Sequence, residues 1–342
     1  MLARALKRRL KIGGCAATIA LSLILALATI QGCTHRAKAN AEIPPALSSS
    51  KQIRTILDKQ ELQQVLVYYA TPDGRYLVPV TVGINPTREL AKTAVEKLLA
   101  GPAREGLART IPEGTKLKEI YSLTGENTAY VDLTKEFLQL KSAKEAKLAL
   151  DSLALTLTEL GGIDSITVLV EGQKIERLGD LEVREPVRRP PAVNPILEGQ
   201  GASSDTVQVY FSDKNALYLI PITIPVPKGK EGERERVALE ALIKGPPPGS
   251  GLLPTVWPGT KLINFFIRDG VAWVNFSQEA LAYGGGSTAE RMFVNSVLLT
   301  LTEAVTVNKV QFLFEGEKRV HLPEGTPVDQ PLPRPEQINM IY

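Results

Sequence analysis

The same ordered stretch occurs twice along the chain. Residues 129–172 contain AYVDL, then a run ending in LTLTE at 155–159, and then VLVEG. AWVNF at 272–276, LTLTE at 299–303 and FLFEG at 312–316 repeat this order. The matching motifs are offset by 143, 144 and 144 residues. A shared period of this size, with strand, helix and strand patterns in each copy, predicts two tandem domains of one fold.

Each copy is expected to follow the order β-β-α-β-β-α-β, with one more short strand over 178–183 in the first copy. Branched and aromatic residues on either side of a Pro-Asp-Gly turn predict an opening hairpin. Apolar residues at helical spacing predict two helices, one with Asn85 as its N-cap and one opened by a Ser142–Glu145 capping box. Both helices are amphipathic, so each needs a sheet to cover. The predicted fold class is α+β, with each domain a sheet covered by two helices on one face.

These patterns divide the chain into six parts. The boundary between the domains is placed where Pro, Gly and Ser accumulate, because such a composition is typical of linkers. The parts are a lipoprotein signal peptide at 1–32, a tether at 33–63, a first domain at 64–183, a linker at 184–205, a second domain at 206–329 and a C-terminal tail at 330–342.

The N-terminus has the pattern of a signal peptide. Basic residues precede an apolar run over 12–30, which ends in Gln31-Gly32-Cys33. A small residue directly before a cysteine resembles a bacterial lipobox, which implies cleavage before Cys33 and attachment of lipid, including palmitate, to its thiol. The alternative is an uncleaved transmembrane anchor, since the run is long enough to span a bilayer. In both cases we expect an extracytoplasmic protein held at the cell membrane.

Charge and cysteine content exclude several classes of function. The chain has 40 Lys and Arg against 37 Asp and Glu, and five of the basic residues lie in the leader, so the rest is near neutral. Net charge therefore gives no case for nucleic-acid binding. Both cysteines, Cys15 and Cys33, lie at the N-terminus, and the two histidines, His35 and His321, are far apart. We expect no metal site, no cofactor and no cysteine nucleophile.

Acidic residues retained in both copies are the first candidates for catalysis, because a duplicated active site would keep them. We interpret them as surface carboxylates at turns, since no partner acid or histidine accompanies them. Asp132 corresponds to Asn275, a replacement that removes a general base and indicates a polar strand position. The retained pairs are Glu159 with Glu303 and Glu171 with Glu315.

Other candidate sites are also weak. Ser250 and Ser287 follow glycines but lack the strand–turn–helix setting and the acid–histidine partners of a hydrolase. The glycines before Ser287 lack a lysine at P-loop spacing. Six aromatic residues at strand positions are predicted to pack in the core rather than to stack on bases or sugars. They are Tyr68, Tyr69, Tyr130, Tyr210, Phe211 and Trp273. The sequence predicts no catalytic residue, and we expect no enzyme.

The repeated unit resembles the GerMN domain, and the chain resembles the tandem-GerMN lipoproteins of spore-forming bacteria. The motifs that carry the resemblance are YLVPV and YLIPI, LLAGP and LIKGP, two GTKL sequences, AYVDL and AWVNF, two LTLTE sequences, and VLVEG and FLFEG. The resemblance implies a role in sporulation and germination and a fold related to the ring-building modules of secretion systems. It also implies association with the channel complex between mother cell and forespore.

Three functions from different classes remain open at this point. The first is a non-catalytic, membrane-anchored scaffold that binds envelope or sporulation-channel proteins, with a ring-like homo-oligomer as one form of assembly. The second is a module that binds a cell-wall glycan or a small ligand, which an exposed cluster of aromatic residues would favour. The third is a hydrolase, which would need a catalytic constellation that the sequence does not contain.

Overall fold

The computed structural model describes residues 63–196, 204–227, 232–282 and 286–340. The predicted signal peptide, the lipidation residue Cys33 and the tether up to residue 62 lie outside the described residues. The two copies belong to one compact unit that runs from Gln60 to Tyr342. Within the described ranges, no helix has the length and apolar character needed to cross a membrane.

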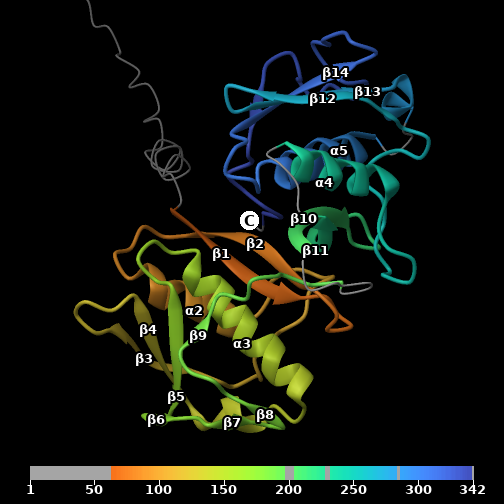
Figure 1. Cartoon of the computed structure of the whole chain (residues 1–342). Coiled ribbons are helices and arrows are strands. Elements are labelled where there is room, and N and C mark those ends of the chain that lie inside the picture. Colours follow the sequence, from red (N-terminus) through yellow and green to blue (C-terminus); the bar gives the residue numbers. More distant parts are fainter. Residues whose placement is uncertain (1–62, 197–203, 228–231, 283–285, 341–342) are drawn as a thin grey trace, which may run out of the picture. The chain divides into compact units, whose positions relative to one another are not determined.

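The first copy has three layers. Strands β1 (Gln63–Ala70) and β2 (Leu77–Ile84) form an antiparallel hairpin. Helices α2 (Leu90–Ala100) and α3 (Ala143–Thr158) contact this hairpin with one side and the main sheet with the other. Figure 1 shows the two helices between the hairpin and the sheet. The main sheet contains β3 (Leu117–Ser122), β4 (Thr128–Leu133) and β5 (Ser165–Val170), with the short helix η1 (Lys135–Gln139) after β4.

The second copy repeats the main elements of the first in the same order. A hairpin and a helix open it, a sheet with a second helix follows, and a short strand closes it. In order, the elements are β10 (Ser204–Ser212), β11 (Leu219–Pro227), α4 (Glu233–Lys244), β12 (Leu262–Arg268), β13 (Val271–Phe276), η2 (Gln278–Leu281), α5 (Gly286–Leu301), β14 (Lys309–Phe314) and β15 (Leu332–Pro333). The predicted α+β class with two tandem copies is confirmed. The sequence did not show that each hairpin is separate from the main sheet.

Both main sheets are mixed. β3 is antiparallel to β4, whereas β4 and β5 are parallel and are joined by the crossover helix α3. The second copy has the same order, with β12 antiparallel to β13 and β13 parallel to β14. β3 and β12 lie at the outer edges of their sheets. Short strands complete the pairing of the first copy; they are β6 (Gln173–Lys174), β7 (Arg177–Leu178), β8 (Leu181–Glu182) and β9 (Val187–Arg188).

The predicted helix starts are partly confirmed. The Ser142 hydroxyl caps α3 by accepting a hydrogen bond from the Glu145 amide (3.2 Å), and the Glu145 carboxylate accepts one from the Lys141 amide (3.0 Å). The prediction of Asn85 as the cap of α2 is wrong, because that helix begins only at Leu90. The residues between them have other partners: the Thr87 amide donates to the side chain of Gln63.

Candidate functional site

The segments that follow the two domains form a second repeat. VREPVRRPPAVN at 183–194 aligns with VDQPLPRPEQIN at 328–339, at an offset of 145 residues. We call residues 183–196 the first arm and residues 328–340 the second arm. The first arm was predicted to belong to the linker, and most of the second arm to the tail. Both instead make specific hydrogen bonds to the hairpins, as described next.

One asparagine in each arm binds the hairpins of both copies. The Asn194 side chain accepts a hydrogen bond from the Leu77 amide (2.7 Å) and donates to the carbonyls of Leu77 (2.7 Å) and Pro221 (2.8 Å). The Asn339 side chain accepts from the Leu219 amide (2.7 Å) and donates to the carbonyls of Leu219 (2.7 Å) and Pro79 (2.8 Å). Each amide therefore joins its own hairpin to that of the other copy. Both asparagines have positive φ angles, of 49° and 51°, which Asn tolerates better than most residues.

Each arm also hydrogen-bonds to the backbone of the opposite hairpin. In the second arm, Ile338 accepts from the Thr81 amide of β2 and donates to the Thr81 hydroxyl, both at 2.8 Å. In the first arm, the Val193 carbonyl accepts from the Thr223 amide (3.1 Å) and hydroxyl (2.7 Å) of β11. Two buried tyrosines bridge the copies in the same reciprocal way: Tyr76 donates to the Ser250 carbonyl and Tyr218 to the Glu105 carbonyl. The two copies are thus joined by a twofold-related set of bonds.

The retained glutamates anchor the arms. The Glu159 carboxylate accepts from the Tyr68 hydroxyl (2.9 Å) and forms an ion pair with Arg189 of the first arm (2.6 Å). In the second copy, Glu303 accepts from Tyr210 (3.4 Å) and pairs with Arg334 of the second arm (2.9 Å). The predicted surface position is confirmed for these two glutamates, which are exposed. The sequence did not show that each of them pairs with an arm, because the arms were predicted to be a linker and a tail.

These Tyr–Glu–Arg groups line one cavity of about 540 Å³ between the copies. Burial, and then the neighbouring glutamate, raises the pKa of Tyr68 and of Tyr210 well above the ordinary tyrosine range. Both hydroxyls therefore stay protonated at neutral pH and donate to the carboxylates. Each carboxylate is engaged by a tyrosine and an arginine, so the groups serve to hold the arms in place rather than to transfer protons.

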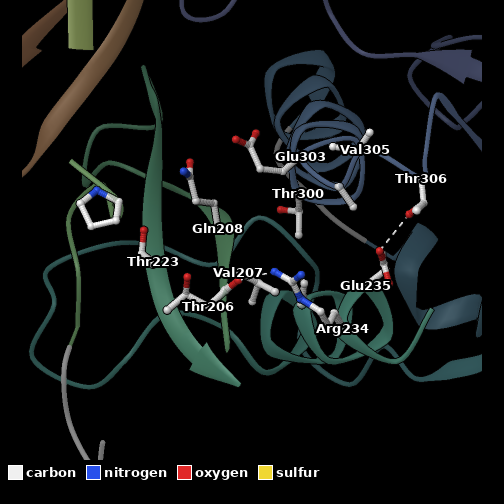
Figure 2. Close-up of a pocket in the computed structure, with 13 residues that line it drawn as sticks. Thr206, Val207, Gln208, Thr223, Arg234, Glu235, Thr300, Glu303, Val305 and Thr306 are labelled. Atoms are coloured by element: carbon white, nitrogen blue, oxygen red, sulfur yellow. Dashed lines mark hydrogen bonds between the residues drawn. The ribbon is translucent and has the colours of Figure 1, made fainter. Parts of the chain in front are cut away.

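A second pocket, of about 390 Å³, lies in the second copy. Figure 2 shows Gln208 reaching it from β10, Thr300 from α5, and Arg234 and Glu235 from α4. Glu235 is buried and accepts from the Thr306 hydroxyl (3.0 Å) and from the Gly232 amide at the start of α4 (2.8 Å). Its carboxylate thus stabilises the helix start. The pocket presents hydroxyl and amide groups together with the charged side chains of Arg234, Glu235 and Glu303.

The other retained polar residues are structural as well. The Asp132 carboxylate accepts from the Gly172 amide (2.9 Å), and the Asn275 side chain accepts from the Gly316 amide (2.8 Å). An aspartate and an asparagine can replace each other here because only an acceptor oxygen is needed. This agrees with the predicted polar strand position. Glu171 and Glu315 lie at exposed turns, as predicted. Within the described ranges, no cluster of three or more His, Cys, Asp and Glu could hold a metal ion.

Two of the six strand aromatics lie outside the core. The prediction of core packing is confirmed for the other four, which are buried. Tyr130 stacks on the exposed Tyr121 with ring centroids 5.1 Å apart, and Trp273 stacks on the exposed Phe266 at 5.8 Å. The Lys318 ammonium lies 5.4 Å from the Trp273 ring centroid. Both pairs lie at corresponding cross-strand positions on the two main sheets. The prediction was wrong here because AYVDL and AWVNF carry large side chains on both faces of the strand.

The burial of Tyr69 can be tested through the pH dependence of the free energy of unfolding. Its hydroxyl donates to the Lys97 carbonyl (2.9 Å), and burial raises its pKa from 10.0 to about 12. The unfolded chain loses this proton near pH 10, whereas the folded chain keeps it until about pH 12. We expect about 2 kcal/mol of stability to be present below pH 10 and to be lost as the pH rises toward 12. Denaturant unfolding across this range should show a smaller loss for Tyr69→Phe, and an equal loss would contradict the assignment.

Comparison with known proteins identifies related chains. The model of the family Germane, described as "Sporulation and spore germination", matches residues 66–176 and 208–320, one match in each copy. The chain is 26% identical over 321 residues to the spore germination protein GerM of Bacillus subtilis, covering 89% of this chain and 86% of that protein. The solved tandem GerMN domains of B. subtilis GerM share its fold, with a TM-score of 0.66 at 23% identity. That match covers 82% of this chain and all of the solved one.

Proposed function

The chain belongs to the Germane family of sporulation and spore germination proteins, and on this basis we propose that it acts in sporulation or germination as a non-catalytic scaffold that binds other proteins. The family match in both copies and the similarity to GerM over most of the chain support the cellular role. The resemblance in the sequence led to the same expectation from the motifs alone.

The observation that carries the scaffold role is the reciprocal bonding of the two copies. A scaffold must hold its binding surfaces at fixed positions, and side-chain, backbone and arm contacts here tie each hairpin to the opposite copy. The acids considered as catalytic candidates instead stabilise this structure: Glu159 and Glu303, which are retained in both copies, hold the arms, and Asp132 closes a turn. The two main sheets present aromatic side chains to solvent. Residues that a duplicated enzyme would use for chemistry thus serve the fold.

The proposed place of action is the outer side of the cell membrane, with lipid on Cys33 as the anchor. The proposed partners are envelope proteins, in particular those of the channel complex between mother cell and forespore. A lipid-anchored body with two similar domains could contact a channel assembly at two related surfaces.

Crosslinking in the native membrane tests this proposal. The full chain would be crosslinked in sporulating cells and purified, and its partners identified by mass spectrometry, beside a Cys33→Ala strain. We expect a small set of envelope or sporulation-channel proteins with the wild-type chain and their loss with Cys33→Ala. Counts of heat-resistant and germinating spores in a deletion strain, complemented with each form, provide the matching functional readout. Normal sporulation and germination in the deletion strain would contradict the proposed role in these processes.

Binding of a cell-wall glycan or a small ligand is the second candidate function. The stacked pairs Tyr121–Tyr130 and Phe266–Trp273 favour it, because exposed aromatic faces pack well against sugar rings. The same crosslinking experiment separates the two candidates. Recovery of wall fragments without proteins would favour the glycan module and would contradict the scaffold.

A further inference from the structure

The two main sheets end in corresponding edge strands that differ in one respect. β3 has the sequence LKEIYS and β12 has the sequence LINFFIR, and each forms the outer edge of its sheet. An edge strand presents unpaired backbone groups to other chains, and proteins commonly protect such edges with charged side chains. The duplication therefore allows a direct comparison of two equivalent edges in one molecule.

β3 is protected and β12 is not. Lys118 and Glu119 are exposed near the start of β3, and Lys118 pairs with Glu171 at 2.6 Å. The corresponding positions in β12 are Ile263 and Asn264, and no charged residue occurs before Arg268. Ile263 is 48% exposed and Phe266 is 44% exposed. A long apolar edge of this kind is a surface on which another strand can pair.

A groove runs beside this unprotected edge. It has a volume of about 590 Å³ and lies between β12 and the start of α4. Gly232 and Arg236 line one side of it, and Phe265, Phe266 and Ile267 line the other. Side chains of a strand added at the edge would enter this groove.

We propose that β12 pairs antiparallel with β12 of a second copy of this chain, so that the two sheets become continuous. The regular part of the strand, from Asn264 to Arg268, supports such pairing. If the pairing is centred on Phe266, the exposed Phe266 rings of the two copies come together next to the Trp273 rings. Phe265 and Ile267 of each strand then lie toward the groove of the other copy.

The charges along the strand fit this occupant. In the antiparallel register Arg268 faces Asn264 of the partner subunit, so like charges do not meet. Arg268 pairs at present with Asp269 at 3.5 Å, and both side chains are largely exposed, so this pair can rearrange at little cost. A parallel arrangement would instead bring the two arginines together. Twofold pairing also uses both free β12 edges, so assembly stops at a dimer and does not continue into a ring.

Light scattering of the full chain in detergent tests the proposal over a range of concentrations. We expect a monomer–dimer equilibrium for the wild type. The variant Phe266→Lys places two lysines opposite each other at the centre of this register, and it should weaken dimerisation by about tenfold or more. The control is Leu138→Lys in the first copy, since Leu138 is also 48% exposed, and its dimerisation should match the wild type. Thermal unfolding establishes that both variants fold.

Hydrogen exchange on the wild type gives a second test that needs no variant. Amides of β12 should become more protected as the concentration rises, whereas those of the equivalent edge β3 should not change. Any one of four results would overturn the proposal: a monomer at all concentrations, an assembly larger than a dimer, a dimer that Phe266→Lys leaves intact, or an equal change in amide exchange with concentration in β3 and β12. If β12 instead bound a strand of a different protein, its amides would be protected only in cell extracts and not in the purified chain, which would also contradict the proposal. The test is independent of the role in sporulation.

Discussion

Replacing Asn339 by alanine is expected to lower the free energy of unfolding by about 3–4 kcal/mol. The change removes three hydrogen bonds and leaves the Leu219 amide and the carbonyls of Leu219 and Pro79 without this partner. An unsatisfied buried polar group costs about 1–3 kcal/mol, and these groups are partly buried. Alanine also fits the positive φ of 51° less well than asparagine. Denaturant unfolding of the full chain measures the change.

Two matched variants separate the causes. Asn339→Gly also lacks the side chain but accepts the backbone angle, so the difference between the glycine and alanine variants reports the backbone strain. Asn194→Ala should have a similar effect, because its three bonds are equivalent. Since Asn339 joins the two hairpins, we also expect its loss to split a single unfolding transition into two. A loss below about 1 kcal/mol with one unchanged transition would show that the asparagines do not hold the copies together.

Replacing Phe276 by alanine is expected to cost about 4 kcal/mol. Phe276 is fully buried, and its ring centroid lies 5.4 Å from that of Phe293, 6.3 Å from that of Phe312 and 6.1 Å from that of Phe314. A large-to-small change at such a site removes apolar burial and leaves a cavity among the remaining rings. The control is Phe266→Ala on the neighbouring strand, where the ring is 44% exposed and the loss should stay below about 1 kcal/mol.

Dilute samples are needed for this comparison, because Phe266 lies in the proposed dimer contact. Denaturant unfolding gives the total loss of stability, and hydrogen exchange shows where it occurs. The cavity lies in the core of the second copy, so exchange should increase first in β13 and β14. Equal losses for Phe276→Ala and Phe266→Ala would contradict the assignment of Phe276 to the core.

The arms explain why the two copies form one unit. Arg189 and Arg334 hold each arm to its own domain through a retained glutamate, and Asn194 and Asn339 then bind both hairpins. The tyrosines of the YLVP and YLIP motifs complete the set through bonds to the opposite copy. Several of the motifs repeated in the sequence are therefore needed for the contact between copies as well as for the fold of each copy.

The positions that differ between the copies are the better candidates for function. Ile263 and Asn264 replace the charges of β3, and Arg234 and Glu235 at the second pocket replace Leu90 and Ala91 of the first copy. Contacts shared by both copies stabilise each domain and join the two domains, whereas each of these differences changes a surface. The proposed dimer edge and the pocket of Figure 2 both lie in the second copy.

The sequence by itself determined the duplication, the order of strands and helices, the α+β class and the family. These features depend on local periodicity, turn residues and ordered motifs, which are visible in the chain without knowledge of its contacts. The cap at Ser142 and the polar strand position of Asp132 and Asn275 followed from the same kind of pattern.

Only the tertiary structure decided the roles of the arms and of the retained glutamates. Asn194 and Leu77 lie 117 residues apart, and a Pro-rich segment that binds two hairpins has the same composition as a free linker. The repeat of Pro, Arg-Pro and Asn at an offset of 145 residues was the one signal that could have revealed the arms. Alternation along a strand also does not say which face meets a helix and which meets solvent, so the exposure of Tyr130 and Trp273 depended on the layer packed against each sheet.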